Sequence, residues 1–221
     1  MPIKTFAFLL LLVLCFCFRF VNGAPEVKQD VVELLIPKLN SDRIAYFFGS
    51  YGVEPIQVNS SLFCGNRIAN LYSIHGDEKI MRTLAIVDFK QPVHESLKQV
   101  HKDISQGQSI GIALRQGGWM IDKLPLYFGS VPLSPQLRVW MQEDTPDRAA
   151  VHIYKLNVFK ENSGEHLHYC TIIEVHSPDY LDENWLQLLY RDQYNNFRKS
   201  SDEVDLLIGS LNALISAFPY P

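Results

Sequence analysis

A stretch of mostly apolar and β-branched residues from Lys79 to Phe89 constrains the fold of this chain more than any other. It contains no glycine or proline and follows a turn-like His75-Gly76-Asp77, so the pattern predicts a long central strand. Because alternate side chains of a strand point to opposite faces, Arg82 is expected on the same face as Leu84 and Ile86. A buried guanidinium needs an anion, either a protein carboxylate or the carboxylate of a ligand.

The segments around this strand predict an α+β fold with an antiparallel sheet flanked by helices. Helices are expected from Asn40 to near Gly52, from Pro92 through Ile104, and after the capping residues Asp182 and Ser201. Short strands are expected over residues 55–58, 70–74, 125–129 and 137–141. Two long strands, 149–160 and 165–176, are joined by Glu161-Asn162-Ser163-Gly164 and form the strongest hairpin signal in the chain.

Composition and the N-terminus indicate an exported protein. The chain has 221 residues, a net charge of −4 and 47% hydrophobic residues, which suits one packed core and gives no basic patch for nucleic acid. Residues 1–23 predict a signal peptide that is cut before Ala24, with a permanent N-terminal anchor as the alternative. We expect a mature domain over 24–179, a helical extension over 180–221, a periplasmic or secreted location and no stable membrane anchor.

Two cysteines, Cys64 and Cys170, follow the predicted cleavage site. In an exported chain such a pair predicts one disulfide, and two separate buried thiols are the alternative that spacing leaves open.

Glu174 lies in a strand that is apolar on both faces, so its carboxylate is expected to be at least half buried. An unpaired carboxylate there would suit a general acid, whereas one beside Arg82 would stay ionised. The two residues therefore either serve a ligand or pair with each other as a structural strut.

The histidines give no basis for a metal site. His166, His168 and His176 share the parity of one strand, but no third ligand is specified by spacing. His94 and His101 lie two helical turns apart, which is too far for direct chelation of one metal. We predict no metal and no phosphate-binding loop.

The order of several short motifs resembles chorismate lyase and its relatives, which include ligand-binding domains of bacterial transcription regulators. The motifs are a helix from Leu39 to Phe48, the strand containing Arg82, a Ser109-Ile110-Gly111 loop after a helix, and Glu174 shortly before Pro178. The resemblance covers residues 39–178.

This resemblance implies an antiparallel sheet around a small buried pocket and a cofactor-free carbon–oxygen lyase reaction that converts chorismate into 4-hydroxybenzoate and pyruvate. It implies that Arg82 binds a ligand carboxylate and that Glu174 contacts the ring oxygen. The backbone around Ile44 and Ile110-Gly111 would complete the enclosure.

Three classes of function remain open at this stage. The chain is a lyase acting on an aromatic or enolpyruvyl carboxylic acid, a non-catalytic binder of a small carboxylic acid, or a secreted interaction protein that docks on a protein partner through residues 180–221.

Overall fold

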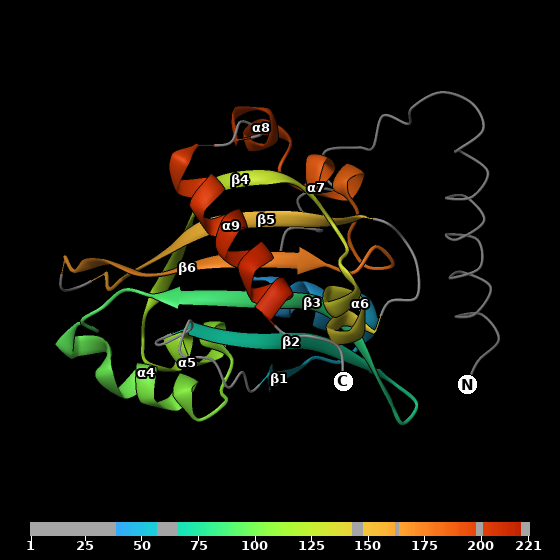
Figure 1. Cartoon of the computed structure of the whole chain (residues 1–221). Coiled ribbons are helices and arrows are strands. Elements are labelled where there is room, and N and C mark those ends of the chain that lie inside the picture. Colours follow the sequence, from blue (N-terminus) through green and yellow to red (C-terminus); the bar gives the residue numbers. More distant parts are fainter. Residues whose placement is uncertain (1–38, 57–65, 143–147, 162–163, 198–200, 218–221) are drawn as a thin grey trace. The chain divides into compact units, whose positions relative to one another are not determined.

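The computed structural model describes residues 39–56, 66–142, 148–161, 164–197 and 201–217. They form an α+β architecture around a six-stranded antiparallel sheet with the strand order β1-β2-β3-β6-β5-β4 (Figure 1). The strands are β1 (Gly52–Ile56), β2 (Asn66–His75), β3 (Glu78–Phe89), β4 (Met120–Pro132), β5 (Arg148–Phe159) and β6 (His166–His176). The helices are α3 (Asn40–Phe48), α4 (Lys98–Ser105), α5 (Ile110–Gln116), α6 (Pro135–Met141), α7 (Glu183–Leu189), α8 (Arg191–Tyr194) and α9 (Asp202–Ala217), with 3₁₀ turns η2 (Glu95–Leu97) and η3 (Asn195–Phe197).

The predicted central strand and the predicted long hairpin are both confirmed. β3 lies between β2 and β6, and β5 pairs with β6 in antiparallel register. Most of β3 is buried, because helices cover both faces of the sheet at its centre. The apolar run from Lys79 to Phe89 therefore lies in the middle of the sheet.

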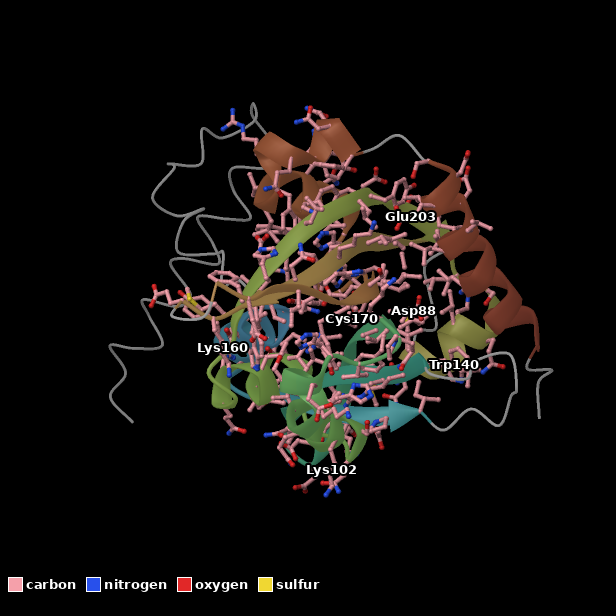
Figure 2. All side chains as sticks on the ribbon, turned by 90° about the vertical axis from the view of Figure 1, so that its left-hand side faces the viewer. Asp88, Lys102, Trp140, Lys160, Cys170 and Glu203 are labelled. Carbon is pink, nitrogen blue, oxygen red and sulfur yellow. The ribbon has the colours of Figure 1, made fainter. Side chains whose placement is uncertain are left out.

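The two faces of the sheet carry separate apolar clusters. On one face, α6 and α9 pack against the centre of the sheet with Leu137, Met141, Val204 and Leu211. On the other face, α4 and α5 pack with Val100, Ile104, Ala113 and Leu114. Figure 2 shows this separation edge-on: Trp140 of α6 and Glu203 of α9 lie on one side of the sheet, and Lys160 lies on the other.

Two local predictions are corrected by the structure. Residues 137–141, predicted as a strand, belong to helix α6, because Pro135 stands in its first turn and the Ser134 side chain accepts a hydrogen bond from the Leu137 amide. Helix α3 ends earlier than predicted, because Gly49 adopts a left-handed conformation with φ of 71° and closes the helix.

The segment after residue 180 contributes to the same core. Asp182 caps α7 by accepting a hydrogen bond of 2.8 Å from the Trp185 amide, as predicted. Val204 and Leu211 of α9 are each 1% exposed. No helix in the described ranges combines the length and the apolar character that spanning a bilayer requires. The predicted signal peptide, residues 1–23, lies outside the described residues.

Candidate functional site

A cavity of about 70 Å³ lies between the sheet and the first turns of α3 and α5. This volume is several times the space that one water molecule needs, so the cavity can hold several water molecules or part of a small organic molecule. Its apolar wall is formed by Leu39, Val53, Ala69, Leu71, Ala85, Val87, Ile110, Leu156 and Ile172. Its polar groups come from Asn40, Ser41, Tyr51, Arg67, Ser109, Lys123, Tyr154 and Glu174, and Gly111 completes the lining.

Arg67 on β2 supplies a positive charge to this cavity. Its Nη1 donates a hydrogen bond of 2.7 Å to the Gln108 carbonyl, and its Nη2 donates one of 3.2 Å to the Gly107 carbonyl. Burial lowers the pKa of the Arg67 guanidinium, and the neighbouring hydroxyls of Tyr51 and Tyr169 act in the opposite direction. Since carbonyl oxygens orient the guanidinium without carrying a full negative charge, Arg67 is prepared for an anionic ligand.

Glu174 on β6 supplies the carboxylate. It is 4% exposed, and its Oε1 accepts a hydrogen bond of 3.0 Å from the Tyr154 hydroxyl. Its Oε2 lies 3.9 Å from His152 Nδ1 and 4.0 Å from His176 Nε2, which is beyond hydrogen-bond distance. Burial and then the charge of Glu174 raise the pKa of Tyr154 well above its usual value, so this hydroxyl remains a donor.

The two histidines beside Glu174 are fully buried and neutral. Burial, followed by the charge of Lys123, lowers the pKa of His152 well below the usual value for histidine. Burial, followed by the charges of Arg43 and Lys123, does the same for His176. Neutral imidazoles can donate or accept one hydrogen bond at each end, so they can support the carboxylate without adding charge.

Lys123 on β4 is the second cation of the cavity. Its ammonium group lies 4.3 Å from the centre of the Tyr154 ring. A cation over an aromatic face is held without being neutralised, so Lys123 adds a positive potential next to Glu174.

Helices α3 and α5 meet over the cavity. Arg115 of α5 makes two hydrogen bonds, of 2.9 and 2.8 Å, to the carboxylate of Asp42 on α3. Gly111 is needed for this approach, because a Cβ atom there would come within 2.5 Å of Leu39 Cδ1. Ile110 and Gly111, which were predicted to lie in a loop, instead form the first turn of α5, and they enclose the cavity through this close contact with Leu39.

The structure brings three of the predicted site residues to the cavity: Glu174, Ile110 and Gly111. Ile44 is fully buried in α3 but does not contribute to the lining, and neither does Arg82.

Arg82 does not share a face with Leu84, which corrects the prediction from strict alternation. The β2–β3 register shifts where Leu71 pairs with Thr83 and Tyr72 pairs with Met81, so Arg82 is the extra residue of a β-bulge. Its Nε donates a hydrogen bond of 3.0 Å to Ser73 Oγ on the cavity face.

The guanidinium of Arg82 is 3.7 Å from the centre of the Phe48 ring at the end of α3. Arg82 therefore supports α3 at one end of this face, while Arg67 reaches the cavity.

Arg67 is the residue that the sequence interpretation missed, because the strand before the turn was predicted to begin at Asn70. The sequence did contain a signal that places Arg67 in a strand. If β3 runs to Phe89, an antiparallel partner across the His75-Gly76-Asp77 turn must begin near residue 66, which places Arg67 inside β2.

The structure describes one of the two cysteines that were predicted to pair. Cys170 carries a free, fully buried thiol, whose pKa is raised by burial and then by the charge of Asp88, and Figure 2 shows it inside the sheet. Cys64 lies outside the described residues, so the pairing of Cys64 with Cys170 stays a prediction. Within the described ranges, no group of three His, Cys, Asp or Glu side chains is arranged to hold a metal ion.

No protein-family model and no curated protein matches this chain.

Proposed function

We propose that this cavity binds a small aromatic or enolpyruvyl carboxylic acid and that the chain is an exported, chorismate-lyase-like protein. The observation that carries the proposal is the placement of Arg67 and Glu174 on one small, mostly apolar cavity. The cation suits a planar carboxylate through paired N–H donors, and the apolar wall suits a ring. Glu174 then accepts a hydrogen bond from an oxygen substituent on the far side of the ring.

The spacing of the strands supports a ligand of this size. Arg67 pairs with Val87, Val87 with Ile172, and Ala85 with Glu174. Two strand separations and an offset of two residues put the Cα atoms of Arg67 and Glu174 about 12 Å apart. Both side chains line the cavity, and we expect one ring to bind between them with its carboxylate at Arg67 and an oxygen at Glu174.

Lys123 adds to the positive charge of the cavity. With Arg67 it gives the cavity two cations against the single carboxylate of Glu174. The resulting net charge of +1 is balanced by a ligand that brings one carboxylate, because desolvated charges require partners.

The reaction class that fits is elimination without a cofactor. In chorismate, the bond between the ring and the enolpyruvyl ether oxygen breaks, and the hydrogen on the neighbouring hydroxyl-bearing carbon leaves as a proton. The ring becomes aromatic as 4-hydroxybenzoate, and the released enolpyruvate takes up a proton to become pyruvate. The proposed contribution of the protein is to hold the ring carboxylate at Arg67 and the hydroxyl at Glu174, so that the substrate is bound in a reactive conformation.

The test uses residues 24–221, incubated with chorismate and followed by chromatography for equimolar 4-hydroxybenzoate and pyruvate. Glu174→Gln is the matched control, since it keeps the shape and removes the charge. Binding of 4-hydroxybenzoate without turnover would favour the non-catalytic binder. The absence of both turnover and 4-hydroxybenzoate binding would overturn the proposal.

A further inference from the structure

A chain of buried hydrogen bonds leads from the loop before α7 to the neighbourhood of Glu174. The Tyr180 hydroxyl donates a bond of 2.7 Å to Asn40 Oδ1, and Asn40 Nδ2 donates one of 3.0 Å to Thr83 Oγ1. Thr83 Oγ1 lies 3.0 Å from His176 Nδ1, and His176 Nε2 faces Glu174 Oε2 at 4.0 Å. The four linking residues come from a loop, from α3, from β3 and from β6, so the chain joins parts that are distant in sequence.

The two ends of this chain carry opposite charges. At one end, the Arg43 guanidinium acts on the Tyr180 hydroxyl, where it opposes the rise in pKa that burial causes. Arg43 is 1% exposed and can only donate hydrogen bonds. At the other end, the Glu174 carboxylate can only accept them.

These ends decide the direction of every link. Because Arg43 supplies hydrogens to its surroundings, the Tyr180 hydrogen is directed to Asn40 Oδ1, and the amide then presents Nδ2 to Thr83. The Thr83 oxygen accepts from Asn40 and keeps a second lone pair, so the direction of its link to His176 is decided at the Glu174 end. A lone pair on His176 Nε2 would face the carboxylate there, so the Thr83 hydrogen is directed to His176 Nδ1. A neutral imidazole that accepts at Nδ1 carries its proton on Nε2. The N–H group of His176 therefore points at Glu174.

The opposite direction is electrostatically unfavourable. If the Asn40 amide were turned over, His176 would donate from Nδ1 to Thr83 and present a lone pair to Glu174 Oε2. Two acceptors would then face each other in a buried, low-dielectric place, where such contacts are costly.

We propose that Tyr180, Asn40 and Thr83 hold His176 as its Nε2–H tautomer, so that His176 acts as the positioning residue for the second oxygen of Glu174. Tyr154 donates to Oε1, and the N–H group of His176 faces Oε2 at 4.0 Å, so a small approach would give the second oxygen a donor as well. Asn40 also lines the cavity, so a ligand bound against Asn40 would act on the same hydrogen-bond chain, and the expected result is a hydrogen bond from His176 Nε2 to Glu174 Oε2. The tautomer is a property of the free protein, and only the ligand step rests on the proposed function.

The first test needs no ligand. Long-range ¹H–¹⁵N correlation spectra of ¹⁵N-histidine-labelled protein distinguish the two neutral tautomers and the imidazolium. His176→Gln identifies the His176 pattern among the seven histidines. We expect the Nε2–H pattern in the wild type. An Nδ1–H or imidazolium pattern would overturn the inference.

The second test breaks the chain at Thr83. Thr83→Val keeps the shape and removes the hydroxyl, and we expect it to lose the uniform Nε2–H pattern. Thr83→Ser keeps the hydroxyl but loses the methyl group, and we expect it to show the wild-type pattern. If Thr83 acted only through its shape, Thr83→Val would keep the wild-type pattern instead. If Thr83→Val does not fold, Tyr180→Phe removes the donor at the other end and has the same expected result. Persistence of the wild-type pattern in the folded variant would refute the proposal.

The ligand step is tested with 4-hydroxybenzoate as the probe, by titration calorimetry. We expect Thr83→Val to weaken binding about tenfold and Thr83→Ser to return it to within about threefold of the wild type. Failure of 4-hydroxybenzoate to bind the wild type would count against the proposed function and leave the tautomer result standing. Normal binding by Thr83→Val would count against the positioning role alone.

Discussion

Arg67 and Glu174 line the same cavity although their strands, β2 and β6, are separated by the whole width of β3. The cation and the carboxylate thus come from strands on either side of β3 and line one cavity. A ligand with an acidic group and a hydroxyl can satisfy both, which makes this pair the first target for mutation.

Substitutions of Arg67 and Arg82 distinguish the arginine that binds a ligand from the arginine that supports α3. We expect Arg67→Met to weaken binding of 4-hydroxybenzoate by roughly ten- to hundredfold, because charge-assisted hydrogen bonds contribute about 1.5–3 kcal/mol. Arg82→Met should leave binding within a fewfold of the wild type, since Arg82 contacts Phe48 and Ser73 instead of the cavity. Calorimetric titration of both variants decides the matter, and a larger loss in Arg82→Met would return the ligand role to that residue.

The buried histidines predict a stability that falls in mild acid. His152 and His176 have depressed pKa values when folded, so below about pH 6.5 the unfolded chain binds more protons than the folded one. As the pH falls below about 6.5, each histidine lowers the unfolding free energy by about 1.4 kcal/mol per pH unit. The full unfolding free energy is therefore present only above about pH 6.5.

Urea unfolding between pH 7 and pH 5 measures this slope. His152→Phe preserves the stacking of the ring on Phe128, whose centre is 4.5 Å away, and should flatten the slope by about 1.4 kcal/mol per pH unit. Equal slopes in the wild type and His152→Phe would contradict the buried, neutral state of His152.

Two glycine substitutions test the close contact above the cavity. Gly111→Ala places a methyl group against Leu39 and should destabilise the protein by about 1–3 kcal/mol, the usual cost of overpacking. Gly209→Ala lies at an exposed position of α9 with no described atom within 4 Å of the new Cβ, and should stabilise by up to about 1 kcal/mol. Thermal melts compare the two, and a neutral Gly111→Ala would show that α3 and α5 are less closely packed.

Burial predicts that the Cys170 thiol is inert in the folded protein. Its pKa is raised by burial, and only the thiolate reacts with alkylating agents. Iodoacetamide at pH 8 should leave the Cys170 peptide unmodified in native buffer and modify it fully in urea, as read by mass spectrometry. Rapid alkylation in native buffer would mean that the strand opens at this position.

The local patterns of the sequence were sufficient for much of the fold. The central strand, the β5–β6 hairpin and the helix caps at Asp182 and Ser201 all follow from periodicity and turn chemistry, which act between neighbours in the chain. Glu174 was also recognisable, because a carboxylate in a doubly apolar strand must be accommodated inside the protein. Residues 137–141 were misassigned because a short apolar run suits a strand and a helix equally, and Ser134 with Pro135 decides for the helix.

Only the tertiary structure decided which arginine shares the cavity with Glu174. Alternation assigns each strand residue to a face, but one β-bulge at Arg82 shifts that assignment, and bulges depend on how two strands pair across the sheet. The same holds for Tyr180, Asn40, Thr83 and His176, whose hydrogen bonds join segments up to 140 positions apart in the sequence. Sequence patterns report the chemistry of neighbouring residues, whereas the direction of a buried hydrogen-bond chain is set by the charges that folding places at its two ends.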